Sequence, residues 1–216
     1  MRVALFDMDR TLVRKNTAEL YVRHQRAIGE ATLVDSLRVA YWLAQYTLGI
    51  VDAEAVAVRA LKQLAGMDET VFASRCDDWF EHDVRPHVSD VGRRAVHAHL
   101  DAGDLCAIVT GATRYGAGPL ARTLGIPHVI ATELECDDRG VFTGRHVPPL
   151  CYGTGKLERV DRLAKEHGFA LADAVFYSDS ISDLPLLEAV ATPVVINPDL
   201  RLGRIGRARG WRIERW

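Results

Sequence analysis

The sequence predicts an α/β fold in which a doubly wound, Rossmann-like parallel sheet forms the core and a small α-helical domain is inserted into it. Three observations predict this fold class: short apolar runs alternate with helical patterns, the runs end in polar or turn residues, and a very long interval separates the first run from the second. Short β-branched or apolar runs between helical patterns are typical of parallel strands joined by crossover helices. The predicted strands are residues 2–6, 105–109, 174–177 and 194–196.

The interval between the first two strands is too long for a simple crossover helix, and it therefore predicts an inserted domain. Within it, apolar residues recur every three or four positions in segments 33–44 and 53–64, which is the periodicity of helices. We therefore assign residues 1–15 and 86–216 to the core, and residues 16–85 to an inserted helical cap.

One more helix and a hairpin are predicted after the insertion. The helix covers residues 89–102 and ends at Gly103, because glycine is common just past helix ends. Two short runs, 133–136 and 141–143, flank the turn-forming segment 137–140, which predicts a hairpin near the edge of the site.

Composition favours a folded protein that acts on small molecules. The chain has 216 residues, of which 48% are hydrophobic and 26% charged, so one sizeable core with a smaller insertion fits the length. A formal net charge of -2 gives no electrostatic reason to expect nucleic acid or an anionic membrane as a partner. Arginines near the C-terminus interleave with apolar residues at helical spacing, which predicts a terminal helix with a solvated basic face, followed by an edge strand over 211–213.

Neither export nor membrane insertion is expected. The N-terminal apolar run meets Asp7 too early for the hydrophobic region of a signal peptide. The longest apolar stretch, 39–51, contains Gln45 and Thr47 and is shorter than the ~20 residues that span a bilayer, so we interpret it as a buried helix. The four cysteines are widely spaced without a C-x-x-C pair, which favours reduced thiols in a cytoplasmic protein. Four histidines lack acidic or cysteine partners at a supporting spacing and are expected on the surface: His82, His87, His97 and His99.

The first strand delivers two carboxylates, Asp7 and Asp9, with one residue between them. Two close carboxylates repel each other unless a cation or a shared proton relieves them. The pair therefore indicates a site for a hard metal ion with one carboxylate free to attack phosphorus, although such pairs also occur in surface turns.

The second strand is followed by Thr110 and Gly111, a hydroxyl and a small residue that leaves backbone N–H groups available to phosphate oxygens. In isolation the same pair also fits a helix cap or a turn at the strand end. A later predicted helix opens with Lys156, at an end where the helix dipole favours an anion. Lys156 therefore either faces a negative group or is an exposed lysine.

The third of these strands leads into Asp179 and Asp183. Asp179 is placed to reach a metal ion, whereas Asp183 either orients a neighbour such as Lys156 or a metal-bound water, or caps the helix that starts at Leu184. Because ligands of open α/β sheets bind outside the carboxyl ends of the strands, all of these groups are expected to converge on one crevice.

The ordered set, strand–D-x-D, strand–T-G, Lys and strand–S-D-x-x-x-D, resembles the haloacid dehalogenase superfamily of phosphohydrolases. It is similar, more narrowly, to the phosphoserine-phosphatase-like branch, in which a helical cap is inserted just after the first motif. The resemblance covers residues 2–211. It implies an α/β core with a helical cap, phosphatase activity and Mg²⁺ as cofactor.

The resemblance also implies roles for individual residues. Asp7 would be the nucleophile and Asp9 the general acid and then the general base. The phosphoryl group would be bound by Thr110, Gly111 and Lys156, and Mg²⁺ would be held by Asp7, the backbone carbonyl of Asp9 and Asp179. Ser182 and Asp183 would lie just behind the metal ion and the lysine.

Some positions depart from the family's pattern. Arg10 replaces a small or uncharged residue, and Ser178 stands where glycine often precedes the metal-binding aspartate. Asn16 occupies the place of a glutamate that contacts the substrate amine in phosphoserine phosphatases, with Glu19 nearby. Arg59 falls at about the place of an arginine that such enzymes use for the substrate carboxylate, and its alternative is a solvent-facing helix position.

The sequence therefore predicts a phosphomonoesterase that acts on a small phosphorylated metabolite, with a phosphoserine-, histidinol-phosphate- or phosphocholine-like substrate. Two alternatives stay open: phosphoryl transfer to an acceptor other than water, and a binding or regulatory protein with vestigial hydrolysis. Arg10 and the apolar segment 39–51 motivate the second of these. The leaving group and the oligomeric state are not encoded in any readable pattern.

Overall fold

A six-stranded parallel sheet organises the computed structural model of the chain, which describes residues 1–29 and 53–216. The strand order is β3-β2-β1-β6-β7-β8, and every neighbouring pair is parallel. The chain starts at the centre and builds outward first on one side and then on the other, which is doubly wound topology. The strands are β1 (Val3–Phe6), β2 (Leu105–Thr113), β3 (His128–Thr132), β6 (Ala174–Ser178), β7 (Thr192–Ile196) and β8 (Arg212–Glu214).

The central strand β1 is buried on both faces because all four of its residues are apolar. Successive side chains of a strand point to opposite faces, so Ala4 and Phe6 join one core and Val3 and Leu5 join the other. Helices α5 (Asp90–Asp101) and α6 (Arg114–Leu124) cover the first face. The second face is covered by α7 (Thr154–His167), α8 (Leu184–Ala189) and α9 (Leu200–Ala208).

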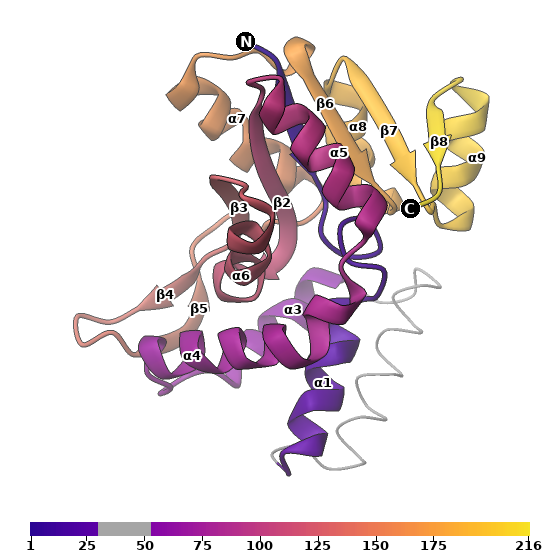
Figure 1. The fold of residues 1–216 in the computed structure, drawn as a ribbon. Helices are drawn as coiled ribbons and strands as arrows, with labels where there is room; N and C mark the ends of the chain where they lie inside the picture. The colour runs from indigo at the N-terminus through magenta and orange to yellow at the C-terminus, as the bar shows by residue number, and fades with distance from the viewer. Residues whose placement is uncertain (30–52) are drawn as a thin grey trace.

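Three more helices follow the first strand, and polar side chains begin two of them. The helices are α1 (Thr17–Ala27), α3 (Ala53–Lys62) and α4 (Glu69–Trp79). Asn16 caps α1 by accepting from the N–H of Glu19, and Asp68 caps α4. In Figure 1 these three helices lie together beyond the ends toward which the strand arrows point. They therefore face the carboxyl edge of the sheet.

A two-stranded antiparallel hairpin lies beside these helices. It consists of β4 (Leu134–Cys136) and β5 (Phe142–His146). Backbone hydrogen bonds join it to the segment before α4, including Phe142 N–H to Met67 O at 2.9 Å. A third apolar cluster, which includes Phe72 of α4, Tyr115 of α6 and Phe142, packs the hairpin, α4 and α6 together.

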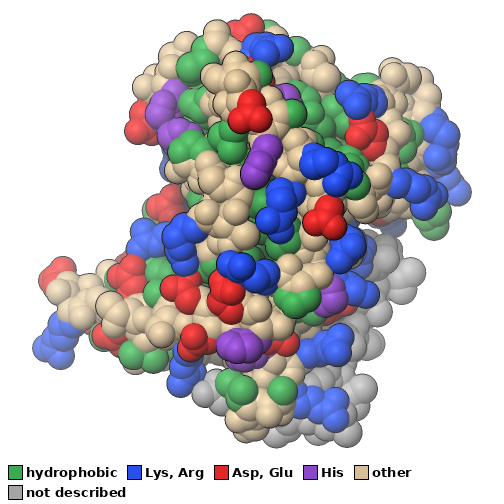
Figure 2. All heavy atoms as spheres, in the orientation of Figure 1, with side chains coloured by type: hydrophobic (Ala, Val, Ile, Leu, Met, Phe, Trp, Pro, Cys, Tyr) green, Lys and Arg blue, Asp and Glu red, His purple; other side chains and the backbone are tan. Residues whose placement is uncertain are grey.

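Most of the predicted elements are confirmed. The four predicted strands, the helix at 89–102, the hairpin, the terminal helix and the edge strand all occur. In Figure 2 basic side chains gather at the right, where Figure 1 places α9, and Arg201, Arg204 and Arg207 of this helix are exposed.

Some expectations were wrong and others fall outside the described residues. Strand β2 continues through Thr110 and Gly111 to Thr113, with a register irregularity after Val109, so these two residues do not form a turn after the strand. Strand β3 was not predicted. The helical pattern at 33–44 and the apolar stretch 39–51 lie outside the described residues. Within the described part of the chain, no helix is long and apolar enough to cross a membrane, and the four cysteines are unpaired.

Candidate active site

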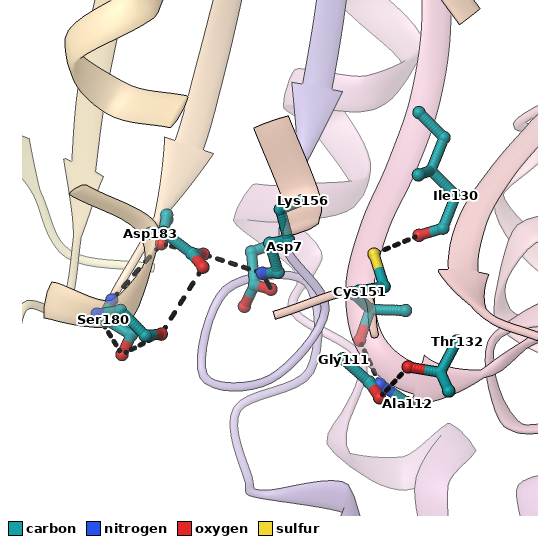
Figure 3. Close-up of polar contacts among 12 residues, drawn as sticks. Asp7, Gly111, Ala112, Ile130, Thr132, Cys151, Lys156, Ser180 and Asp183 are labelled. Atoms are coloured by element: carbon teal, nitrogen blue, oxygen red, sulfur yellow. Dashed lines mark hydrogen bonds and ion pairs between the residues drawn. The ribbon is translucent and has the colours of Figure 1, made fainter. Parts of the chain in front are cut away.

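A buried lysine joins two buried aspartates at the carboxyl edge of the sheet. Lys156 Nζ lies 2.6 Å from Asp7 Oδ1 and 2.8 Å from Asp183 Oδ2, and the lysine is only 3% exposed (Figure 3). Burial alone would lower the pKa of Lys156, but the charges of Asp183 and Asp7 outweigh it and raise the pKa. The prediction that Lys156 faces a negative group is confirmed, and the exposed-lysine alternative is wrong.

Two glycines at the start of α7 allow the backbone conformation and the close packing that position Lys156. Gly153 precedes the helix with φ 54°, a left-handed conformation that glycine adopts at no steric cost. A Cβ on Gly155 would lie 2.0 Å from the carbonyl oxygen of Leu150, so only glycine fits where the loop passes the helix. Sequence reasoning noticed the lysine but missed this close approach.

Asp183 is oriented by three side chains. Its Oδ2 accepts from Lys156 and from the buried hydroxyl of Ser178 at 2.7 Å. Ser182 Oγ lies 3.5 Å from Asp183 Oδ1 and 2.9 Å from Ser180 Oγ, so Ser182 lies beside the aspartate. The Asp183 side chain makes no capping hydrogen bond to α8, so the capping alternative is wrong; its contact with Lys156 agrees with the alternative in which it orients that lysine.

Asp9 points to the start of α1. Its Oδ1 accepts from the backbone N–H of Thr17 at 2.6 Å, and Thr17 is the first residue of that helix. Burial raises the pKa of Asp9, while the hydrogen bonds from Thr17 and the charges of Lys156 and Arg10 oppose the rise. Asp9 is therefore held in one place, with a pKa above the ordinary value of an aspartate.

Asp179 follows β6 and is 5% exposed. Within the described residues its carboxylate has no hydrogen-bond donor, although its backbone carbonyl accepts from Asp199 N–H at 2.9 Å. Burial and, to a smaller extent, the charges of Asp7, Asp183 and Asp9 together raise the pKa of Asp179 to about 9. An unpartnered carboxylate among like charges is an unfavourable arrangement that a bound cation relieves.

The carboxyl group of Asp7 is also buried among like charges, but its pKa rises less than that of Asp179. The pKa of Asp7 is raised to about 7: burial is the largest cause, the Lys156 charge opposes the rise, and the charges of Asp183 and Asp9 add to it. A single lysine therefore faces several carboxylates. Oxygen donors in such an excess of negative charge fit a hard divalent cation such as Mg²⁺.

Thr110 and Gly111 lie on the strand next to Asp7. Phe6 pairs with Ile108, so Asp7 and Thr110 both lie just beyond that pair on neighbouring strands. Thr110 is 1% exposed and its Oγ1 accepts from Ala112 N–H at 3.1 Å, while the carbonyl of Gly111 accepts from the Thr132 hydroxyl at 2.9 Å. These contacts, drawn in Figure 3, fix the irregular end of β2 beside the Asp7–Lys156 pair.

The three predicted specificity residues do not converge in the same way. Asn16 is engaged as the cap of α1, whereas Glu19 and Arg59 are exposed. Within the described residues, no hydrogen bond or ion pair joins any of them to Asp7, Lys156 or Asp183.

The sequence did not predict a chain of hydrogen bonds that joins Asp104, His99 and Tyr177 behind the site. His99 binds Asp104 through Nδ1 at 2.7 Å and the Tyr177 hydroxyl through Nε2 at 2.8 Å, so the expectation of a surface histidine was wrong. The Tyr177 carbonyl accepts from the N–H of Asp7 at 2.9 Å, and its ring stacks on Phe6. No local pattern reveals this chain, because its members come from α5, β6 and the loop between α5 and β2.

The doubly wound sheet and the aspartates and lysine at its carboxyl edge define a hydrolase of the haloacid dehalogenase type. The family model described as haloacid dehalogenase-like hydrolase matches residues 4–188, and the chain belongs to this family. Together with its relatives, this membership makes the chain a phosphatase.

Individual relatives agree with this assignment. The chain is 35% identical over 215 residues to phosphoserine phosphatase SerB1 of Mycobacterium tuberculosis, covering 98% of this chain and 70% of that protein. It is 27% identical over 216 residues to a histidinol-phosphatase of Neisseria meningitidis, covering 98% and 97%. A crystal structure of a protein with unknown function from Bordetella pertussis superposes with a TM-score of 0.89 at 35% identity, covering 99% and 97%.

Proposed function

We propose that this phosphatase is an Mg²⁺-dependent phosphomonoesterase that works through an aspartyl-phosphate on Asp7 and acts on a small phosphorylated metabolite. The observation that carries the proposal is the buried Asp7–Lys156–Asp183 arrangement beside the unpartnered carboxylate of Asp179. A structural ion pair alone would not need this excess of buried negative charge.

Asp7 attacks phosphorus with the oxygen that Lys156 does not hold. Lys156 binds Oδ1, which orients the carboxylate and leaves Oδ2 for attack. A phosphate ester repels a carboxylate, so the lysine cation also reduces the barrier by neutralising charge on the phosphoryl oxygens. Thr110 and the backbone at Gly111 lie beside the pair and bind the same phosphoryl group.

Asp9 acts as the general acid for the leaving alcohol and then as the general base for the attacking water. The burial that raises its pKa keeps a proton available for the oxygen of the leaving alcohol, and the Thr17 N–H holds the carboxyl group in position. After the alcohol leaves, the deprotonated Asp9 accepts a proton from the water that attacks the aspartyl-phosphate. One carboxyl group thus serves both steps.

Asp7, Asp179 and the backbone carbonyl of Asp9 would hold Mg²⁺, which supplies positive charge that stabilises the phosphoryl oxygens. Asp183 and Ser182 support this arrangement from behind by fixing Lys156. The donors are all oxygens, as Mg²⁺ prefers.

The division into a core of residues 1–15 and 86–216 and a cap of residues 16–85 is part of the proposal. Helices α1, α3 and α4 face the carboxyl edge of the sheet in Figure 1, where a cap would cover a bound substrate. The proposed substrate is a small phosphorylated alcohol. The names of two relatives make phosphoserine and histidinol phosphate the first compounds to compare.

Phosphate release from a panel of phosphorylated metabolites, with Mg²⁺ or with EDTA, tests the proposal. Asp7→Asn is expected to lower kcat by about three orders of magnitude or more, because the amide cannot attack phosphorus. Asp101→Asn, the same substitution at an exposed position, is the matched control. Turnover by Asp7→Asn at the wild-type rate, or full activity in EDTA, would refute the mechanism. Analysis of products in the presence of added alcohols separates hydrolysis from phosphoryl transfer.

A further inference from the structure

The side-chain amide of Asn197 joins the C-terminal segment to the loop that carries Asp9. Asn197 directly follows β7, and its Nδ2 donates to the carbonyl of Arg10 at 3.0 Å and to the carbonyl of Trp216 at 3.3 Å. Its Oδ1 accepts from the N–H of Trp216 at 3.1 Å. The amide therefore uses both of its N–H groups and its oxygen, and all three partners are backbone groups of segments that lie far apart in the sequence.

The backbone of Arg10 has a conformation that needs support from its surroundings. Its φ of 53° lies in the left-handed region, which is unfavourable for a residue with a side chain and persists only where other contacts hold it. The N–H of Arg10 donates within its own loop, to the carbonyl of Lys15 at 3.3 Å, whereas Asn197 holds the carbonyl from outside the loop. This hydrogen bond therefore ties the residue next to Asp9 to the end of β7.

The turn that contains Asn197 is itself tied to a second part of the site. Two residues further on, the N–H of Asp199 donates to the carbonyl of Asp179 at 2.9 Å, and Asp199 Oδ2 accepts from the N–H of Ile181 at 2.7 Å. In Figure 1 the C-terminus lies near the ends of the strand arrows, at the edge of the sheet where the loop after β1 also lies. The turn after β7 therefore connects the loop after β1 with the segment after β6.

The position of Asp9 depends on contacts from two directions. Its carboxyl group accepts from the N–H of Thr17 at 2.6 Å, and its backbone continues into Arg10, which Asn197 holds. A general acid has to lie within hydrogen-bond reach of the leaving oxygen, so even a small displacement of this loop weakens proton transfer. Thr17 thus fixes the carboxyl group, and Asn197 fixes the backbone that carries it.

We propose that Asn197 is a positioning residue for the reaction, which holds the loop of Asp9 so that this carboxyl group donates its proton to the leaving oxygen. The inference rests on the proposed function and adds to it a residue that does not touch the substrate. As the P–O bond to the alcohol breaks, its electron pair stays on the alcohol oxygen, which takes the proton from Asp9. A displaced Asp9 slows this step most for a poor leaving group, because a stable anion leaves with little help from an acid.

Phenyl phosphate and para-nitrophenyl phosphate are matched probes, because they differ only in a nitro group that makes the leaving phenol more acidic. Both phenols leave in the step that forms the aspartyl-phosphate, so kcat/KM with Mg²⁺ compares that step. We expect Asn197→Gly, which suits the φ of 42° at this position, to lower kcat/KM for phenyl phosphate about tenfold more than for para-nitrophenyl phosphate.

Asn197→Asp should shift the ratio of the two kcat/KM values in the same direction. Aspartate keeps an acceptor for the N–H of Trp216 but has no donor for the carbonyl of Arg10. An added negative charge acts on the phosphate group that both probes share, so it does not produce the shift by itself. Equal losses on both probes in the two Asn197 variants, or no loss, would overturn the proposal.

Trp216→Ala is the control for the C-terminal segment. The ring of Trp216 packs against that of Tyr177 with centroids 5.2 Å apart, whereas Asn197 contacts the backbone of Trp216. This variant should therefore unfold at a lower urea concentration but keep the wild-type ratio of the two probes. The same shift of the ratio in Trp216→Ala would place the effect in the C-terminal segment and overturn the role of Asn197.

Asp9→Asn separates this inference from the proposed function. It should shift the ratio in the same direction as Asn197→Gly and by more, because the amide does not act as an acid. An unchanged ratio in Asp9→Asn, or no turnover of either probe by folded wild-type protein, would refute the proposed mechanism itself. A shift in Asp9→Asn without one in the Asn197 variants would refute the role of Asn197 alone.

Discussion

At the scale of single residues, the site is built from charges whose burial has to be compensated. Lys156 balances Asp7 and Asp183, and each of the three is less than a tenth exposed. Ser178 adds a neutral donor to Asp183 at the position where glycine is common in the family. This hydroxyl brings no charge to the network, so its removal tests the hydrogen bond to Asp183 without changing the net charge of the site.

Ser178→Ala should lower the free energy of unfolding by about 2 kcal/mol, because a buried carboxylate loses a donor. Asp183 then holds Lys156 less firmly, so kcat should fall as well, by about tenfold. Urea unfolding and phosphate release measure the two effects. Ser74→Ala, the same substitution at an exposed position of α4, is the control. A Ser178→Ala protein that is as stable and active as the wild type would show that this hydrogen bond contributes to neither stability nor turnover.

At the scale of elements, the strands that end at the site could be predicted from the sequence, whereas some neighbouring elements could not. Strands β1, β6 and β7 are compact apolar runs followed by polar residues, so hydrophobic pattern alone locates them. Helix α6 was missed because it contains Gly116, Gly118 and Pro119, which lower helix propensity, and burial of its apolar face compensates. The contacts of Lys156 with Asp7 and Asp183 could not be predicted from the local sequence, because they depend on how the strand ends come together.

The hairpin β4–β5 gives an element-scale test of how α4 is held against the core. Phe142 packs edge-on against Phe72 of α4 and Tyr115 of α6, with ring centroids 5.5 Å and 5.4 Å apart, and is 2% exposed. Phe142→Ala should therefore lower the free energy of unfolding by about 3–5 kcal/mol. Urea unfolding measures the loss, and Val71→Ala, at an exposed position of α4, should change it by less than about 0.5 kcal/mol. A small effect of Phe142→Ala would mean that the hairpin contributes little to holding α4.

At the scale of the whole molecule, the excess of buried carboxylates links folding to pH and to metal. In the metal-free protein, Asp179 has a pKa of about 9, against 3.8 as the ordinary value. Between these two values the folded state keeps a proton that the unfolded state has lost. The stabilisation is therefore fully present below about pH 4 and is lost as pH rises toward 9, with a limiting slope of about 1.4 kcal/mol per pH unit for one group.

Under the proposed function Mg²⁺ should reverse this trend, because it would bind the deprotonated carboxylates of a site that only the folded chain assembles. We expect the free energy of unfolding in EDTA to fall between pH 5.5 and pH 8.5, and the gain on adding Mg²⁺ to grow over the same range. Asp179→Asn should reduce the pH dependence in EDTA, leaving the part that comes from Asp7, whose pKa is raised to about 7, and should abolish most of the gain; Asp101→Asn should leave both as in the wild type. Stability in EDTA that rises with pH would mean that Asp179 is ionised without a cation. A gain from Mg²⁺ that persists in Asp179→Asn would place the metal ion elsewhere.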